Sequence, residues 1–311
     1  MSGVLTVGET MAALRTPLPL RLGGPAHLSV AGSESNVAIG LSRLGHEAHW
    51  LGAVGDDQPG ELVLRTLRAE GVGLRFARTA PDAPTGFIAF DRAAHDITRV
   101  SYHRRGSAGS TLTAAETTAA VTAGTPDLVH LTGITPALSD TARAATLAAA
   151  RTARAVGARV SLDVNHRARL WSRAEAAAAL RELLPWVDTV FASEDELDLL
   201  TAADDAVPAL LAGGTAEVVV TAGAAGAHAH TPGSSRFQAA VPTTVADSIG
   251  AGDAFVAGYL SAALDGLPIE DRLARGVTAG AFCVAGRGDW ESLPTRSDLA
   301  LLARGDGTAL R

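Results

Sequence analysis

The alternation of strand-like and helix-like segments constrains the fold of this chain more than any other feature. Short apolar runs are followed by longer stretches with helical spacing. We predict strands at residues 4–8, 50–54, 128–131, 160–164, 189–191 and 218–220, and helices at residues 35–44, 61–69, 139–156 and 173–184, with two more within 252–286. Strands joined by helices in this way form right-handed crossovers and a parallel sheet that is covered on both faces. The sequence therefore predicts an α/β fold with a mostly parallel central sheet.

Two segments depart from this alternation. Residues 10–30 are rich in Pro and Gly, and residues 72–105 contain alternating runs that are typical of an antiparallel hairpin. Because ligands of open α/β sheets bind beyond the carboxyl ends of the strands, we expect a small β lid over that edge. The chain, residues 1–311, is thus predicted to be a single α/β domain with lid segments at about 10–30 and 72–105. Strand edges in such a lid favour pairing between subunits, so we expect a homo-oligomer.

The chain has no lysine, and all 26 of its basic residues are arginine. This excludes the Walker A phosphate loop, the strand lysine of protein kinases and every enzyme that forms a Schiff base through lysine. Any phosphate must therefore be bound by backbone amides, helix N-termini, arginine or a metal ion. Each single arginine is also weaker evidence for a binding site, because arginine fills the surface positions that lysine would otherwise take.

Composition also narrows the partners and the compartment. The formal net charge of −7 argues against a nucleic acid or a membrane surface as the main partner. The lone cysteine, Cys283, excludes an internal disulfide framework, and no apolar run reaches the roughly 18 residues of a spanning helix. The first residues lack the basic segment of a signal peptide. We therefore expect a cytoplasmic protein that binds a small molecule.

The sharpest motif is Asp-Ser-Ile-Gly-Ala-Gly-Asp at residues 247–253, which runs directly into an apolar helix. Its small residues leave the first N–H groups of the helix uncovered, and the positive end of the helix dipole then favours a phosphate group. Asp253 ends this motif, where a carboxylate is placed to accept a proton from a substrate hydroxyl. The alternative is a tight strand-to-helix turn in which Asp253 is only a favourable N-terminal charge.

This motif resembles the D-T-x-G-A-G-D signature of the ribokinase-like (PfkB) sugar kinases, with Ser248 in place of the usual Thr. Residues 31–45 and 55–60 resemble two further signatures of the same family. The three signatures occur in the family's order, and the resemblance covers nearly the whole chain. It implies a ribokinase-like three-layer sandwich with a mostly parallel central sheet and a small β lid.

The resemblance also implies an activity, an ATP-dependent phosphorylation of a sugar. Asp253 would be the catalytic base, and the amides of Gly250, Ala251 and Gly252 would form the anion hole for the transferred phosphoryl group. ATP and Mg²⁺ are the implied cofactors. Some members of the family depend on a monovalent cation, and the sequence leaves that dependence open.

Further matches concern the nucleotide and the metal ion. The family's N-x-x-E motif, which holds magnesium through water, has its counterpart in Ser-Glu-Asp-Glu at residues 193–196, so Glu196 is the implied metal residue. The same four residues also fit an ordinary helix capping box, and both interpretations stand. The implied nucleotide contacts are Asn165, Ser193, Thr221, Gly223, Gly226, Gly250 and Gly252. The Gly-containing turn at 221–226 is a weak signal on its own, because such turns commonly join two strands.

Three stretches resemble the 2-keto-3-deoxygluconate kinases within this family, at residues 100–108, 163–172 and 288–295. An acidic sugar agrees with the residues found there, because Arg104 and Arg167 are able to pair with its carboxylate. The implied substrate contacts are Gly32, Ser33, Asn36, Phe87, Tyr102, Arg104, Arg167, Asp253 and Asp289.

The sequence thus predicts phosphorylation of the terminal hydroxyl of a small acidic keto-sugar, with 2-keto-3-deoxygluconate as the favoured substrate and its 6-phosphate as the product. His103 and His166 stand where the related kinases often have Tyr, so the hydroxyl contacts there differ. Two alternatives remain, a neutral-sugar kinase of the fructokinase or ribokinase type and a non-catalytic sugar-binding regulator with the same fold. Substrate choice depends on a few pocket contacts, which change without altering the signatures.

Overall fold

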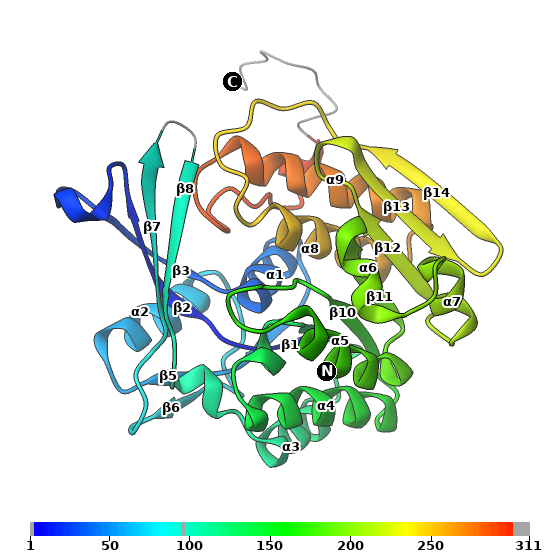
Figure 1. Ribbon diagram of the computed structural model, residues 1–311, viewed down its shortest axis with the longest axis horizontal. Coiled ribbons are helices and arrows are strands. Elements are labelled where there is room, and N and C mark those ends of the chain that lie inside the picture. Colours follow the sequence, from blue (N-terminus) through cyan, green and yellow to red (C-terminus); the bar gives the residue numbers. More distant parts are fainter. Residues whose placement is uncertain (1–2, 95–96, 301–311) are drawn as a thin grey trace.

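The computed structural model describes residues 3–94 and 97–300 and contains a central sheet of eight strands (Figure 1). From one edge to the other they are β14 (Ser234–Ala239), β13 (Gly226–Thr231), β12 (Glu217–Thr221), β11 (Thr189–Ser193), β10 (Arg159–Asp163), β9 (Leu128–Thr132), β1 (Val4–Val7) and β4 (Ala48–Leu51). From β12 to β4 each strand is parallel to the next one. β13 pairs antiparallel with both β12 and β14. The predicted mostly parallel sheet is confirmed.

Helices cover both faces of this sheet (Figure 1). One core contains residues of α1 (Ser33–Arg43), α2 (Gln58–Ala69), α8 (Ala251–Leu264) and α9 (Ile269–Ala285). The other contains residues of α3 (Ala114–Gly124), α4 (Asp140–Ala155), α5 (Arg173–Leu183), α6 (Leu197–Leu200) and α7 (Ala206–Ala212). Neighbouring residues of β1 divide between the two cores, Val4 in the first and Leu5 in the second, as the alternation of strand side chains requires.

A second, four-stranded sheet stands to one side of the central sheet (Figure 1), and we call it the lid. Its order is β3 (His27–Ala31), β2 (Met11–Thr16), β7 (Phe87–Ala94) and β8 (Ile97–His103). Met11, Ala13, Ala31, Ile88 and Phe90 form an apolar cluster on one of its faces. Ile249, in the loop before α8, packs against this cluster. The lid therefore faces the segment that carries the sharpest sequence motif.

Residues 72–86, the first part of the second predicted lid segment, do not enter this sheet. β6 (Arg78–Ala80) pairs instead with β5 (Ala53–Gly55) in a separate two-stranded sheet. The lid strands of this segment therefore begin at Phe87 rather than at residue 72, because β5 takes the backbone hydrogen bonds of β6. Within residues 3–94 and 97–300, no helix is both long enough and apolar enough to cross a membrane.

Candidate active site

A cavity of about 470 Å³ lies between the lid and the carboxyl ends of the parallel strands. Asp163, Ser193 and Thr221 are the last residues of β10, β11 and β12, and each lines the cavity. The N-terminal ends of α1 and α8 and one face of the lid complete its wall. The cavity thus lies where open α/β sheets bind their ligands, as expected.

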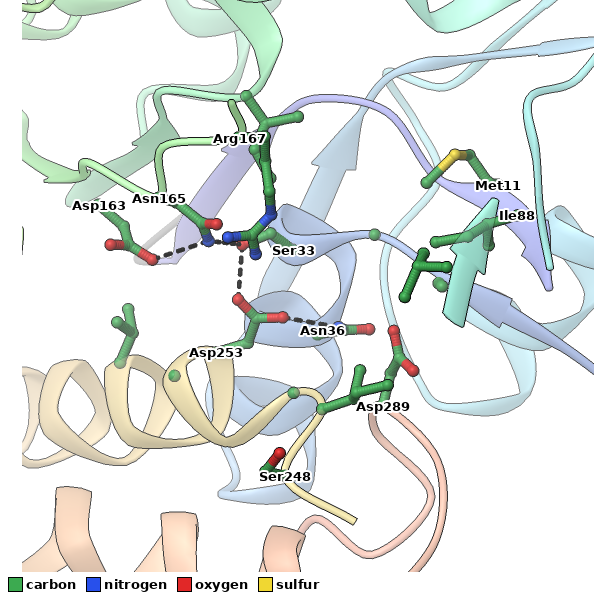
Figure 2. Close-up of a pocket in the computed structure, with 18 of the residues that line it drawn as sticks. Met11, Ser33, Asn36, Ile88, Asp163, Asn165, Arg167, Ser248, Asp253 and Asp289 are labelled. Carbon is green, nitrogen blue, oxygen red and sulfur yellow. Dashed lines mark hydrogen bonds between the residues drawn. The ribbon is translucent and has the colours of Figure 1, made fainter. Parts of the chain in front are cut away.

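Asp253 lies in the first turn of α8 and has 8% of its surface exposed. Its Oδ1 atom accepts a hydrogen bond from the Ser33 hydroxyl at 2.6 Å, and its Oδ2 atom accepts one from the Asn36 amide at 2.7 Å (Figure 2). Burial raises the pKa of Asp253, whereas these hydrogen bonds and the charge of Arg167 lower it. The structure therefore brings three predicted residues together and holds the carboxylate in one orientation.

A second carboxylate, Asp163, is joined to this group through Asn165. The Asn165 amide donates hydrogen bonds to the Ser33 hydroxyl at 3.0 Å and to Asp163 at 3.1 Å (Figure 2). Asn165 has a φ of 40°, in the left-handed region where strained residues of functional sites are often found. Burial and the charges of Glu196 and Asp253 raise the pKa of Asp163 to about 8. Asp163 therefore keeps its proton near neutral pH in the absence of a ligand.

Gly250 forms the turn that precedes α8. Its φ is 81°, and a Cβ atom at this position would lie 2.1 Å from the carbonyl oxygen of Asp289. Within the described part of the chain, no side chain caps α8, and the amides of Gly250, Gly252 and Asp253 have no hydrogen-bond acceptor. The Ala251 amide differs, because it donates a long hydrogen bond of 3.4 Å to the Ser248 carbonyl. The arrangement leaves a helix N-terminus open to an anion.

Arg167 follows β10 in a loop and lines the cavity. Figure 2 shows its guanidinium group directed toward Asp253. Among the residues that the structure describes, this guanidinium makes no hydrogen bond and no ion pair. Its charge lowers the pKa of Asp253 and of Asp163, but neither carboxylate pairs with it directly, so a ligand carboxylate can do so.

Arg104 also lines the cavity, but it is buried and paired. Its Nε atom donates a hydrogen bond of 2.6 Å to Glu9, and a second guanidinium nitrogen contacts the same carboxylate. The Ser107 hydroxyl donates to Glu9 as well, and the Arg104 guanidinium lies 5.7 Å from the ring centre of Tyr102. Glu9 therefore offsets the charge of Arg104, which leaves Arg167 as the stronger of the two predicted partners for a carboxylate.

Glu196 makes the capping box that the sequence allows. Its two carboxylate oxygens accept hydrogen bonds from the Ser193 amide at 2.9 Å and from the His166 amide at 2.7 Å. Across residues 3–94 and 97–300, no three His, Cys, Asp or Glu side chains lie close enough to hold a metal ion together. A metal role for Glu196 thus remains a prediction, and it requires water or ligand oxygens in the coordination shell.

Most of the predicted site residues line this one cavity. They are Gly32, Ser33, Asn36, Tyr102, Arg104, Asn165, Arg167, Ser193, Glu196, Thr221, Gly250, Gly252, Asp253 and Asp289. Ala251 does not line it, since its amide turns toward Ser248. Gly223 lies in the turn between β12 and β13, and Gly226 is the first residue of β13; both are outside the cavity lining. A Cβ atom at Gly226 would lie 2.1 Å from the Gln238 carbonyl, and its φ is 124°, so strand packing and backbone conformation explain that glycine.

Phe87 requires a correction, because it lies on the opposite face of the lid from the cavity. It borders a separate groove with Leu28 and the side chains of α2. In the hairpin, Tyr102 pairs with Ile88, and Phe87 pairs with His103. Since paired residues share a face of the sheet, Phe87 and Tyr102 cannot both reach the cavity.

Several further residues line the cavity that the sequence motifs did not indicate. They are Met11, Ala31, Ile88, Phe90, Val100, Ile134, Asp163, Phe191, Ala192, Ser248, Ile249 and Val256. Two of them could have been predicted from the sequence pattern. Asp163 ends a predicted strand on the ligand-binding edge, and Ile88 follows from the pairing with Tyr102.

The chain is similar in sequence and in fold to known carbohydrate kinases. The model of the pfkB family of carbohydrate kinases matches residues 1–296. The 2-dehydro-3-deoxygluconokinase of Bacillus subtilis (strain 168) is 36% identical over 307 residues, which are 95% of this chain and 94% of that protein. The fructokinase of Klebsiella pneumoniae is 32% identical over 287 residues, or 86% of this chain and 90% of that protein. A crystal structure of a PfkB protein from Polaromonas sp. JS666 has a TM-score of 0.86 and 34% identity, with 96% and 99% of the two chains covered.

The fold, with its lid over the strand ends, and the cavity define a carbohydrate kinase. The chain belongs to the PfkB family, which the family match over residues 1–296 establishes. The ribokinase-like fold predicted from the three signatures is confirmed, and so is the prediction of a sugar kinase.

Proposed function

We propose that this kinase transfers the terminal phosphoryl group of ATP to the terminal hydroxyl of 2-keto-3-deoxygluconate, also called 2-dehydro-3-deoxygluconate. The observation that carries this proposal is the guanidinium of Arg167, which lines the cavity without a hydrogen bond or ion pair among the described residues. A carboxylate on the sugar gives this charge a partner and fixes the sugar's orientation. The name of the Bacillus subtilis relative supports the same substrate.

The residues around Asp253 are suited to the proton transfer. Ser33 and Asn36 hold both of its oxygens, so the carboxylate meets a substrate hydroxyl in a fixed orientation. Asp253 accepts the proton of that hydroxyl as the oxygen attacks the phosphoryl group. The amides of Gly250 and Gly252 and the positive end of α8 stabilise the negative charge of the phosphoryl group.

The same part of the cavity fits a nucleotide and a divalent cation. The open N-terminus of α8 suits phosphate oxygens. Burial and then the charges of Glu196 and Asp253 raise the pKa of Asp163, and a cation bound there would offset those charges. Glu196 would hold Mg²⁺ through water, since amides occupy both of its oxygens. Asn165 and Thr221 are the nearby side chains proposed for the nucleotide. When bound, Mg²⁺ neutralises part of the charge on the phosphate groups.

A neutral-sugar kinase is the second candidate. Glu9 already balances the charge of Arg104, so among the described residues that line the cavity Arg167 is the one arginine without an ion pair. Asn36 and Asp289 suit the hydroxyls of a neutral sugar equally well. The similarity to a fructokinase supports this alternative.

The substitution Arg167→Met separates the two candidates. If Arg167 pairs with the sugar carboxylate, its loss removes about 2–5 kcal/mol of binding free energy. The value of kcat/KM for the keto-acid then falls roughly 30-fold or more. Turnover of fructose or ribose should fall less, because those sugars lose only the effect of Arg167 on the pKa of Asp253. Arg105→Met is the matched control, because Arg105 is exposed and outside the cavity. An equal loss with acidic and neutral sugars would show that Arg167 has a structural role and would favour the second candidate.

We also propose that two chains associate through the lid. Leu20, Leu22, Leu28 and Ile97 all belong to the lid segments and are 44%, 59%, 59% and 64% exposed. Exposed apolar side chains on both edge strands of the lid and on the segment between β2 and β3 favour a partner surface. Sedimentation should therefore show a dimer, and Leu22→Asp with Leu28→Asp should yield a monomer. The control Phe237→Asp removes an exposed aromatic side chain on β14 and should leave the dimer intact. A wild-type monomer would contradict this proposal.

A further inference from the structure

Arg15 extends from β2 of the lid to two carboxylates outside the lid, one of which, Asp289, lines the cavity. One guanidinium nitrogen lies 3.1 Å from Asp247, and another contacts Asp289. The guanidinium carbon also lies 4.0 Å from the ring centre of Phe90, a residue of the neighbouring lid strand. Only 16% of the Arg15 side chain is exposed, so the contact is partly shielded from water. Neither the sequence motifs nor the proposed function assigns a role to this residue.

The two carboxylates belong to the segments that shape the anion loop, residues 247–252. Asp247 begins that loop, and its second oxygen accepts a hydrogen bond of 3.1 Å from the Ile249 amide. The carbonyl of Asp289 packs against Gly250 so closely that a Cβ atom there would lie at 2.1 Å. Asp289 also lines the cavity itself. One side chain of the lid therefore holds both the start of the anion loop and the segment packed against its centre.

Neighbouring contacts place the same segment against the lid. The Trp290 indole donates a hydrogen bond of 3.1 Å to the Val30 carbonyl, and Glu291 accepts one of 2.5 Å from the Ser29 hydroxyl. Residues 289, 290 and 291 thus each contact a lid strand. Among the three, Asp289 alone lines the cavity. The position of the lid is therefore connected to a group that would meet the sugar.

We propose that Arg15 is a positioning residue that couples the lid to the anion loop and keeps Asp289 as a hydrogen-bond acceptor for a sugar hydroxyl. The proposal rests on the kinase function proposed above but not on the identity of the sugar. A guanidinium suits this role because its planar fork can hold two carboxylates at once. A lysine in its place would carry the charge on one compact group.

Charges around Asp289 support this role. Burial raises its pKa to about 7, with further increases from Asp253 of α8 and from Glu291, whereas Arg15 lowers it. Asp247 faces it through Arg15, and the Cys283 thiol of α9 contacts its carbonyl. That thiol is neutral, since its own pKa is raised to about 12. Loss of Arg15 therefore moves the titration of Asp289 to higher pH and removes the ionised acceptor near neutrality.

The test compares Arg15→Gln and Arg15→Lys with Arg99→Gln in kcat, KM and the pH profile of kcat/KM. Arg99 is the matched control, because it lies on lid strand β8 with an exposed side chain and pairs loosely with Asp91 at 3.8 Å. The profile of kcat/KM reports groups that titrate in the free enzyme. Arg15→Gln should raise KM for the sugar at least 10-fold at pH 7, with a smaller effect at pH 9, because the acceptor is ionised again there. Its profile should shift to higher pH by about one unit.

Arg15→Lys separates charge from bridging. It should keep the pH profile of the wild type, because the charge beside Asp289 remains. Its kcat should still fall at least 5-fold, because one ammonium cannot hold both carboxylates. This variant also decides the question if Arg15→Gln does not fold. A kcat of Arg15→Lys equal to that of the wild type, or a profile of Arg15→Gln that matches Arg99→Gln, would overturn the proposal.

The test of Arg15 does not depend on which sugar is the substrate. If the wild type phosphorylates a neutral sugar, the same measurements are made with that sugar, and the expected shifts are unchanged. If the wild type phosphorylates no sugar, the proposed function fails, and sugar binding is measured by calorimetry between pH 6 and 9. Weaker binding by Arg15→Gln that recovers toward pH 9 would still support the role of Arg15, and equal binding at every pH would contradict it.

Discussion

Asp253→Asn should lower kcat by roughly 10²-fold or more, the usual size of a general-base contribution. The carboxylate is held by Ser33 and Asn36 at 2.6 and 2.7 Å, beside the open N-terminus of α8. Asparagine preserves the size of the side chain but does not accept the hydroxyl proton. We therefore expect sugar binding, measured by calorimetry, to remain within a few-fold of the wild type while turnover falls.

Asp271→Asn is the matched control for this variant. Asp271 occupies the first turn of the neighbouring helix α9 and is exposed, so it shares the helical position without the contacts. Its turnover should equal that of the wild type. If Asp253→Asn turned over like the control, Asp253 would be only an N-terminal charge of α8, the alternative that the motif alone left open.

The second large effect is expected for Gly250→Ala. Alanine would have to adopt a φ of 81° and would place its Cβ atom 2.1 Å from the Asp289 carbonyl. The left-handed conformation alone costs about 1–2 kcal/mol, and backbone must move to relieve the contact. The amides of the anion loop then leave their positions. Loss of a single such donor typically costs about 10²–10³ in kcat, and we expect a decrease of at least that size.

Gly280→Ala controls for the exchange of a glycine in this layer of helices. The nearest atom to a Cβ atom at Gly280 is the Ala251 carbonyl oxygen at 3.7 Å, an ordinary van der Waals distance. Gly280 lies within α9, where alanine is the better helix former. The control should keep full activity and an equal or higher melting temperature. Full activity of Gly250→Ala would show that the anion loop does not contribute to phosphoryl transfer.

Local patterns were sufficient to predict the parallel strands of the central sheet and the loop before α8, but not strands β13 and β14, and the strand predicted at residues 50–54 divides between β4 and β5. Each buried strand is a short apolar run, and both faces of a parallel sheet are covered, so the strands stand out from the helices that follow them. The motif at 247–253 likewise predicts a turn, because Gly250 adopts the positive φ that the turn requires and glycine does so more readily than other residues. Such features depend on neighbours in sequence.

The ion pairs of the cavity could not be predicted in the same way. Arg104 meets Glu9 across 95 residues of sequence, and Arg15 meets Asp289 across 274. No local pattern specifies these partners, because they depend on where the lid rests on the rest of the fold. The prediction that Phe87 contacts the substrate was also wrong. Which side chains of a strand face the cavity depends on its pairing with the neighbouring strand, which the local sequence does not give. Tertiary packing thus determines which arginine remains free for a ligand.

Consumption of ATP with a panel of sugars tests the central claim most directly. The panel contains 2-keto-3-deoxygluconate, its galacto epimer, fructose, ribose and adenosine. We predict turnover confined to the two keto-acids, because the unpaired guanidinium of Arg167 lies in the cavity with Asp253. Turnover of fructose, ribose or adenosine without the keto-acids would contradict the proposed substrate, although the family and the role of Asp253 would stand.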